Sequence, residues 1–398
     1  QVPEVQAALT CINSHNGEIV AMVGGYDYHT NKFNNATQGL RQTGSAYKPF
    51  IYTAAVEDGM TPDMVVSGAP IKRGGWTPHN YDGSLSHGNV PMKIALAKSY
   101  NIAAVHLLEQ VGIQAGAQMV RRFGISNPMA PSLPSALGAS EASLLEMTAA
   151  YSAFPNKGVR MTPHLIRKVY SRDGSLLEQY ENQSTKVTSE YVALTMVQMM
   201  RGVTSGGGTA AGASAGGVPL AGKTGTVNDH TDVWFIGYTP TYVTGVWMGN
   251  PLRKESLGAG MTGGHGAVPY FNAFMIPFMK DKPRDSFPGV PPMPNDIKAL
   301  AERNKREELE KLEDADLAGK KTGIVFTPGV KVTDEPGMMP PDKVGGDKPG
   351  DDTKTDKPAV TDQPPVQRRP PVPPPAVKPD PPSDKPEGTR RKGKKGDG

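Results

Sequence analysis

The composition of the chain changes toward its C-terminus, and this change limits how much of the chain can fold. From about residue 340 to residue 398 the sequence consists mostly of Pro, Lys, Asp and Gly, as in PPVQRRPPVPPPAVKPDPP. Such a segment cannot bury enough apolar surface to offset the loss of chain entropy. We therefore expect a disordered tail over residues 340–398, which ends in a basic cluster at residues 390–395.

The apolar side chains lie mainly ahead of residue 283, where we expect one domain over residues 1–282. Pro-rich turns and a polar helix candidate follow, and we interpret residues 283–339 as a linker that contains this helix. The net charge of +4 is too small to indicate a nucleic-acid partner. Cys11 is the single cysteine, so no internal disulfide can form. No apolar run is long enough to predict a membrane span.

The order of the predicted elements is strands, then helices, then strands. Residues 6–24 contain two apolar runs around NSHNG and predict a β-hairpin at the edge of a sheet. Residues 91–124 and 143–154 are helical in pattern, and residues 220–250 predict two or three antiparallel strands. This order indicates a mixed α/β (α+β) domain whose sheet is assembled from both ends of the sequence, with helices packed on it.

A serine and a lysine lie three residues apart in GSAYKPF, residues 44–50. If a helix begins at Ser45, the two side chains lie on one face and can meet, and Pro49 falls in the first turn, where a missing N–H costs least. The helix dipole would favour an anion on Ser45 and disfavour an ammonium on Lys48. A neutral lysine can take the proton that a serine nucleophile must lose. The motif alone is weak, because a serine at a helix start is commonly only a cap.

Ser99 and Asn101 form a second polar pair in AKSYNIAAV, between two helical runs. Residues 223–226, KTGT, form a third set and precede strand-like sequence. Lys223 supplies positive charge there, and Gly225 would let another backbone segment approach closely. Hydroxyl groups along the same strand edge come from Thr224 and Thr226.

Two similar motifs are interpreted as having no catalytic role. Ser14-x-Asn16 lies in the hairpin turn and has ordinary turn chemistry. The sequence Lys-Thr-Gly recurs at residues 321–323, but it lies beside the predicted tail and lacks a flanking strand pair.

The order and spacing of the three polar sets, Ser-x-x-Lys, Ser-x-Asn and Lys-Thr-Gly, are far more specific than any one of them. Together with ATQGLRQTGSAYKPFIYTAAVEDG, GGWTPHNYDG, GASEASLLEMTAAYSAFPNKG, AGKTGTVNDHTDVWFIGYTP and MTGGHGAVPYF, they resemble the transpeptidase domain of class A penicillin-binding proteins. The resemblance extends from Val5 to about Lys280. One departure is Thr43, where the family usually has proline. The resemblance implies a five-stranded antiparallel sheet with helices on both faces and a site beside the Lys-Thr-Gly strand.

The resemblance also implies roles for matching residues. Ser45 is similar to the nucleophile that attacks the D-Ala–D-Ala bond of a peptidoglycan stem peptide, and Lys48 is similar to its general base. Ser99 resembles the residue that relays a proton to the leaving D-Ala, and Lys223 resembles part of the same network. The backbone N–H groups of Ser45 and Thr226 resemble an oxyanion hole.

The substrate-binding residues implied by the resemblance lie in the second and third sets. Asn101 resembles the amide that holds the acyl chain. Thr224, Gly225 and Thr226 resemble the strand that holds the terminal carboxylate. The implied chemistry is transfer of an acyl group from Ser45 to the amine of a neighbouring strand, with inhibition by β-lactams, which mimic D-Ala–D-Ala.

Neither a metal nor an organic cofactor is expected, and His79 and His87 are interpreted as surface residues of a loop. Trp76, Trp234 and Trp247 are interpreted as packing residues of the sheet and the nearby loop rather than as glycan platforms. The resemblance implies an extracytoplasmic location, with stem peptides, β-lactams and cell-wall synthesis proteins as partners. The resemblance to class A members also implies that an anchor and a glycosyltransferase domain precede this domain, and the first residue, Gln rather than Met, fits a sequence that begins inside a longer protein.

Three alternatives share the same motifs. A β-lactamase would need a base that activates water, and Glu141 and Glu146 lie instead in sequence that resembles penicillin-binding proteins. A D,D-carboxypeptidase would use water as the acceptor. A non-catalytic β-lactam sensor or cell-wall scaffold would keep the fold and use the tail for binding. For the tail itself we favour a solvated linker over a segment that binds anionic wall polymers.

Overall fold

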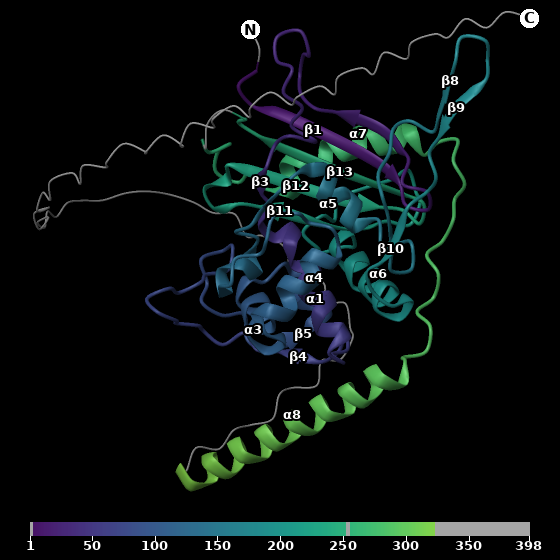
Figure 1. Cartoon of the computed structure of the whole chain (residues 1–398). Coiled ribbons are helices and arrows are strands. Elements are labelled where there is room, and N and C mark those ends of the chain that lie inside the picture. The colour runs from purple at the N-terminus through teal and green to yellow at the C-terminus, as the bar shows by residue number, and fades with distance from the viewer. Residues whose placement is uncertain (1–2, 252–254, 323–398) are drawn as a thin grey trace, which may run out of the picture. The chain divides into compact units, whose positions relative to one another are not determined.

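A five-stranded antiparallel sheet forms the centre of the part of the chain that the structure describes. The computed structural model describes residues 3–251 and 255–322 (Figure 1). The strands lie in the order β11-β12-β13-β1-β2. Their bounds are β1 (Gln6–Asn13), β2 (Ile19–Val23), β11 (Ala221–Thr226), β12 (Asp232–Tyr238) and β13 (Tyr242–Gly249). The expected fold class, a five-stranded antiparallel sheet with flanking helices, is confirmed.

The first strand of the chain pairs with the last strand of the sheet. β1 and β13 run antiparallel from Gln6 opposite Gly249 to Asn13 opposite Tyr242. The predicted hairpin is formed by β1 and β2, and β2 is the edge strand. Both expectations from the sequence, a hairpin at the sheet edge and a sheet assembled from the two ends of the domain, are confirmed.

Eight α-helices lie within the described residues. They are α1 (Lys48–Glu57), α2 (Met92–Lys98), α3 (Asn101–Val111), α4 (Ile113–Arg122), α5 (Leu144–Tyr151), α6 (Glu190–Thr204), α7 (Val268–Phe278) and α8 (Asn295–Thr322). The helical pattern of residues 91–124 therefore corresponds to three helices, and that of residues 143–154 corresponds to α5 and the turn after it.

Short elements complete the described part of the chain. The short helical turns are η1 (Gly44–Tyr47), η2 (Leu133–Leu137) and η3 (Asn228–His230), which are 3-10 helices, and η4 (Gly263–Ala267), which is a π-helix. The short strands are β3 (Arg41–Gln42), β4 (Val65–Val66), β5 (Val90–Pro91), β6 (Glu141–Ala142), β7 (Val159–Met161), β8 (Lys168–Tyr170), β9 (Leu176–Gln179) and β10 (Ser184–Lys186).

The two faces of the sheet pack against different helices. On one face Phe235 packs edge-on against Phe271 of α7, with ring centroids 4.9 Å apart. On the other face Trp234 and Trp247, which are opposite each other on β12 and β13, belong to the main core with α1, α5 and α6. Figure 1 shows α7 on the side of the sheet away from α1, α3 and α4. Residues alternate between the two faces along each strand, so both faces of β12 are apolar.

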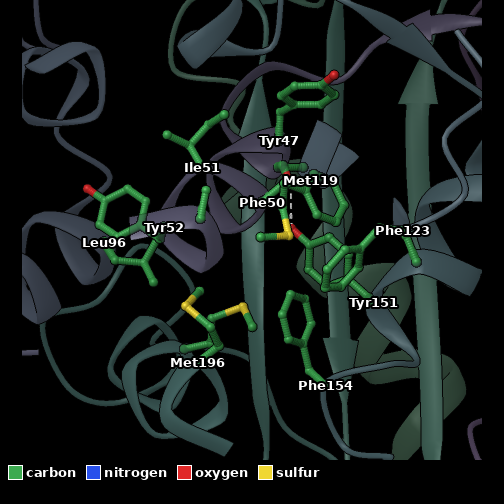
Figure 2. Packing of buried hydrophobic residues seen from close by; sticks show 14 of the residues in the cluster. Tyr47, Phe50, Ile51, Tyr52, Leu96, Met119, Phe123, Tyr151, Phe154 and Met196 are labelled. Atoms are coloured by element: carbon green, nitrogen blue, oxygen red, sulfur yellow. Dashed lines mark hydrogen bonds between the residues drawn. The ribbon is translucent and has the colours of Figure 1, made fainter. Parts of the chain in front are cut away.

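Aromatic rings connect α1 to the helices around it. Phe50 of α1 makes an edge-on contact with Tyr151 of α5, at 5.8 Å, and a tilted contact with Phe123 after α4, at 5.3 Å (Figure 2). Phe154 contacts both Phe123 and Tyr151. The helical spacing of Tyr52, Ala55 and Val56 in the sequence predicts one apolar side of α1, but every residue from Lys48 to Val56 is buried. The difference arises because α3, α4 and α6 enclose α1 on its remaining sides.

The polar helix predicted after the domain is α8. Its first turns contact the end of α1: Asn304 donates from Nδ2 to the carbonyl of Asp58 at 2.6 Å, and Ile297 is buried. The division into residues 1–282 and 283–339 stays a prediction. The predicted disordered tail, residues 340–398, lies outside the described residues, as does Gly323 of the second Lys-Thr-Gly. Over the residues that the structure describes, we find no helix with the length and apolar character needed to cross a bilayer.

Candidate active site

Ser45 lies in a 3-10 turn rather than at the start of an α-helix. The turn η1 covers Gly44–Tyr47, and α1 begins at Lys48, whose backbone N–H donates to the carbonyl of Ser45. Pro49 falls in the first turn of α1, as predicted, where no intrahelical partner is lost. The expected helix start is therefore three residues too early, because the turn that carries Ser45 is closed by an i to i+3 hydrogen bond, from the Lys48 N–H to the Ser45 carbonyl, rather than by an α-helical one.

Two glycines allow η1 to lie directly against β11. A Cβ on Gly225 would lie 2.4 Å from the carbonyl oxygen of Thr43, and a Cβ on Gly44 would lie 2.5 Å from that of Thr226. Both distances are shorter than any side chain tolerates. The close backbone approach that the sequence predicts at Gly225 is therefore made by Thr43, and it places Ser45 beside the end of β11.

The amine of Lys48 lies among three oxygen atoms of the second polar set. Lys48 Nζ donates to the carbonyl of Ser99 at 2.7 Å, to Ser99 Oγ at 3.2 Å and to Asn101 Oδ1 at 2.7 Å. Ser99 caps α2 in the left-handed conformation, with φ 60°, and α3 begins at Asn101. The turn between these helices therefore presents Ser99 and Asn101 to the N-terminal end of α1.

The hydroxyl of Ser99 also accepts a hydrogen bond from the second lysine, Lys223. Lys223 Nζ donates to Ser99 Oγ at 2.9 Å and to the carbonyl of Thr224 at 3.1 Å. Lys48 and Lys223 are both fully buried. Burial lowers the pKa of Lys48 well below its usual value, and the charge of Lys223 lowers it further. Burial likewise lowers the pKa of Lys223 to about 7.

The hydroxyl of Ser45 is half-buried and faces a cleft. The sequence predicts that the Ser45 hydroxyl and the Lys48 amine can meet, but among the hydrogen bonds of the described residues none joins these two groups. Lys48 Nζ is instead directed to Ser99 and Asn101. Hydrogen bonds of a catalytic group are often made only once substrate is bound, so this arrangement leaves Lys48 a candidate base.

The two threonines of β11 have separate partners. Thr224 Oγ1 lies 2.7 Å from Thr209 Oγ1, and Thr226 Oγ1 accepts from the backbone N–H of Gly263 at 3.1 Å. Because the Thr226 hydroxyl accepts there, its own proton is free to point elsewhere. Sequence reasoning missed Thr209, since it lies in a Gly/Ala/Ser-rich loop without a pattern of its own.

The predicted residues meet at a cleft of about 760 Å³. Its lining includes Ser45, Ser99, Asn101, Thr224 and Thr226. Lys48, Lys223 and Gly225 are buried behind this surface. The two lysines reach it through their hydrogen bonds to Ser99 Oγ, and Gly225 lies between Thr224 and Thr226 on β11. The structure therefore brings all three polar sets together. Further lining residues come from other segments of the chain: Trp76, His79, Asn80, Tyr81, Lys98, Thr209, Asp229, His230, Thr262 and His265.

The loop before β5 holds Asn101 in place. Asn101 Nδ2 donates to the carbonyl of His79 at 2.8 Å, and Asn80 Oδ1 accepts from the backbone N–H of Asn101 at 2.8 Å. His79 is exposed, as interpreted from the sequence, but its carbonyl orients a candidate site residue. His87 lies outside the cleft lining and stacks on Tyr100, with ring centroids 4.2 Å apart.

The three tryptophans divide into two kinds. Trp234 and Trp247 are fully buried, so their interpretation as packing residues is confirmed. Trp234 Nε1 also donates to the carbonyl of Gln42 at 2.9 Å and thereby ties β3 to the sheet. Trp76 is half-buried and lines the cleft, where a side chain can contact ligand as well as the loop.

Glu146 caps a helix and does not stand in the position of a β-lactamase base. Its carboxylate accepts from the backbone N–H of Ser143 and completes a capping box at the start of α5. The same carboxylate accepts from the hydroxyl and the backbone N–H of Ser126. These hydrogen bonds lower the pKa of Glu146, although burial opposes them. Neither Glu146 nor Glu141 lines the cleft.

Comparison with known proteins identifies relatives with the same domain. The sequence of residues 7–275 matches the family described as the penicillin binding protein transpeptidase domain. Penicillin-binding protein 1A of Neisseria meningitidis is 38% identical over 295 residues, which cover 71% of this chain and 37% of that protein. Penicillin-binding protein 1A of Aquifex aeolicus is 38% identical over 292 residues, which cover 72% of this chain and 40% of that protein. The chain thus spans well under half the length of these relatives.

Solved structures agree with this match. The crystal structure of penicillin-binding protein 1A from Haemophilus influenzae superimposes with a TM-score of 0.69 at 30% identity and covers 73% of this chain and 50% of that chain. PonA1 from Mycobacterium tuberculosis in complex with penicillin V superimposes with a TM-score of 0.66 at 27% identity, and covers 73% of this chain and 85% of that chain. The fold, the family match and the 38% identity agree, and the chain belongs to the family of penicillin-binding protein transpeptidase domains.

Proposed function

We propose that this chain is a serine-type peptidoglycan D,D-transpeptidase, which cross-links stem peptides through an acyl-enzyme after release of the terminal D-Ala. The observation that carries the proposal is the meeting of Lys48 and Lys223 at the hydroxyl of Ser99, beside Ser45 and in one cleft. Two buried amines that hinder each other's protonation supply a base at neutral pH without a carboxylate. Membership of the family supports the same reaction.

In the first step Ser45 Oγ attacks the carbonyl carbon between the two D-Ala residues, and Lys48 takes its proton. The backbone N–H groups of Ser45 and Thr226 stabilise the oxyanion. The close packing of η1 on β11, which Gly44 and Gly225 allow, supports this assignment because it brings the two segments together. Donors fixed in this way contribute about 3–4 kcal/mol each in acyl-transfer enzymes.

In the second step the bond between the carbonyl carbon and the leaving nitrogen breaks. The leaving D-Ala nitrogen takes a proton from Ser99 Oγ, which Lys223 and Lys48 then resupply. The two hydrogen bonds to Ser99 Oγ, at 2.9 and 3.2 Å, support this relay. Thr224 and Thr226 hold the terminal carboxylate of the donor.

Asn101 holds the acyl chain in this proposal. Its Oδ1 accepts from Lys48, and one N–H of its amide donates to the carbonyl of His79. An amide nitrogen carries two N–H groups, so the second is available to a substrate carbonyl. The same residue therefore connects the position of the base to the position of the acyl chain.

β-Lactams are proposed as ligands of the same cleft, since a relative, PonA1, has been solved with penicillin V. An extracytoplasmic location and cell-wall synthesis partners are proposed on the family match. An N-terminal anchor and a glycosyltransferase domain in the same protein stay predictions.

Labelling with a fluorescent penicillin tests the proposal. The purified chain is expected to form a covalent adduct that survives denaturation, and Ser45→Ala is expected to abolish it. A folded chain that forms no adduct would overturn the proposal and favour a scaffold. An adduct lost within seconds, with hydrolysed β-lactam, would indicate a β-lactamase. Cleavage of a D-Ala–D-Ala peptide without transfer to an added amine would indicate a carboxypeptidase.

A further inference from the structure

The second half of the proposed reaction needs a group that binds the acceptor, and none of the residues assigned above has this role. The acceptor is an amine, and a primary amine is mostly an ammonium ion at neutral pH. Lys98 lies on the wall of the cleft, and the buried pair Lys48 and Lys223 behind Ser45 adds a further positive charge whenever one of its amines is protonated, so a second cation is repelled on its way to Ser45. A cation entering the cleft therefore needs a negative group to bind it.

Asp229 is the single carboxylate among the residues that line the cleft within residues 3–251 and 255–322. It lies in η3, the turn between β11 and β12, which directly follows the KTGT strand. Within the same described ranges, its carboxylate takes part in no ion pair or side-chain hydrogen bond with another residue. The carboxylate is exposed and available to a ligand.

The turn that carries Asp229 is held in an uncommon conformation. Asp229 and His230 both have positive φ values, 65° and 54°. Such conformations are sparsely populated by residues other than glycine and persist where surrounding contacts fix them. Here His230 Nδ1 lies 2.7 Å from the carbonyl oxygen of Met261, the backbone N–H of Leu257 donates to the carbonyl of His230, and the His230 ring packs edge-on against Tyr81. The carboxylate of Asp229 is therefore presented from a fixed position.

Resting on the proposed function, we propose that Asp229 binds the ammonium group of the acceptor strand and so favours amine over water as the nucleophile that removes the acyl group from Ser45. The ligand class is a primary ammonium attached to a peptide. Asp229 receives this group at the β11–β12 turn, and the amine then moves toward Ser45, where the lysines disfavour its charged form.

In the transfer step the acyl group passes from Ser45 to the amine of the acceptor. The bound ammonium gives one proton to water and becomes a neutral amine. Its nitrogen attacks the ester carbon, a C–N bond forms, and the C–O bond to Ser45 Oγ breaks. The second proton leaves the nitrogen through Lys48 and reaches Ser45 Oγ. The products are an amide cross-link and the free serine, and no oxidant, reductant or further reactant is consumed.

The test compares an amine acceptor with a neutral isostere. The full chain is acylated with a thioester analogue of the donor peptide, and the acyl group is offered to D-alanine amide, to D-lactamide, which has a hydroxyl in place of the amine, and to water. Asp229→Asn removes the charge and keeps the shape, and asparagine tolerates a positive φ at least as well as aspartate, so the turn is preserved.

We expect Asp229→Asn to lower the ratio of transfer to D-alanine amide over hydrolysis about tenfold, the size of effect that one charge-assisted contact gives. Acylation by penicillin and transfer to D-lactamide should stay at the wild-type rates. Asp173→Asn is the matched control, because it removes an exposed carboxylate from another β-turn, between β8 and β9, outside the cleft. Asp173→Asn should change neither the ratio of transfer to D-alanine amide over hydrolysis nor the rates of acylation and of transfer to D-lactamide.

Three results would overturn the inference. An unchanged amine-to-water ratio in Asp229→Asn would show that the carboxylate does not bind the acceptor. An equal loss of transfer to D-lactamide would show that the residue acts through shape rather than charge. If the wild-type chain is not acylated by penicillin at all, the proposed function fails, and the inference fails with it. Normal acylation with an unchanged ratio rejects the inference alone.

Discussion

Lys48 and Lys223 direct their amines to one oxygen atom, Ser99 Oγ, at 3.2 and 2.9 Å. The two residues come from α1 and β11, which are more than 160 residues apart in the sequence. Both amines are buried, and the pKa of each lies below its ordinary value. The protonation of this pair therefore sets the conditions under which the proposed chemistry can run.

Acylation by a β-lactam should depend on pH because its base is a buried amine. The pKa of Lys223 is about 7, and protonation of Lys223 places a cation beside Lys48. We expect the second-order acylation rate to reach a plateau above about pH 8 and to fall about tenfold for each pH unit once the pair is protonated. Stopped-flow measurement with a fluorescent penicillin checks this, with circular dichroism at each pH as the control for folding. A rate that is constant from about pH 5 to pH 9 would contradict it.

Lys223→Met should change how stability depends on pH. In the folded chain Lys223 has a pKa of about 7, whereas an unfolded lysine has a pKa of about 10.4. Between these values the unfolded chain binds more protons than the folded chain, so the free energy of unfolding of the wild type rises with pH. The Lys223→Met variant lacks this rise, so its free energy of unfolding should exceed that of the wild type by the largest amount below pH 7. Urea unfolding at several pH values measures the difference, and a difference that is independent of pH would refute the prediction.

Gly225→Ala should displace η1 from β11. The added Cβ would lie 2.4 Å from the carbonyl oxygen of Thr43, so the backbone that carries Ser45 must move. We expect a loss of about 1–3 kcal/mol in the free energy of unfolding and an acylation rate lower by about 100-fold. Gly212→Ala is the control, because a Cβ at Gly212 meets no atom within 4 Å. Equal effects of the two substitutions would rule out the close approach as the cause.

Tyr151→Phe should loosen the turn that carries Ser45. The Tyr151 hydroxyl donates to the carbonyl of Ala46, and both groups are buried (Figure 2). Removing the donor leaves this carbonyl unsatisfied and should cost about 1–3 kcal/mol.

Tyr52→Phe is the matched control for that change. The hydroxyl of Tyr52 is also buried, but it has no hydrogen-bond partner among the described residues, so its removal should be neutral or stabilising. Urea unfolding of both variants tests the contrast. If both lose the same free energy, the bond to Ala46 has no special role.

The parts of the site that could be predicted from sequence are those carried by short local patterns. Ser45 with Lys48, Ser99 with Asn101, and the KTGT strand each lie within a few residues, and their order is informative. The sheet could be predicted because strand patterns occur at both ends of the domain. In each case a local sequence pattern determines a local structure.

The residues that sequence reasoning missed reach the site through long-range contacts. Thr209 meets Thr224 only because the Gly/Ala/Ser-rich loop passes the outer edge of β11, and His79 contributes a carbonyl, which any residue has. Periodicity predicts one apolar side for α1 because it describes a helix on a surface, and nothing in the sequence of α1 shows that other helices surround it. Asp229 follows Asn228 in a pair of residues that is common in ordinary turns, so its sequence does not distinguish it from a residue that only forms a turn.

The pairing of β1 with β13 has a consequence for biosynthesis. The ribosome synthesises β1 (Gln6–Asn13) more than two hundred residues before β13 (Tyr242–Gly249). Until β13 has been synthesised, the edge of β1 that does not pair with β2 has no partner strand. Contacts of such large sequence separation fold slowly and leave strand edges open to other chains. The nascent domain therefore completes its sheet, and with it the neighbourhood of Ser45, only when nearly all of its residues have been synthesised, and a chaperone that shields β1 until then would raise the yield of native enzyme.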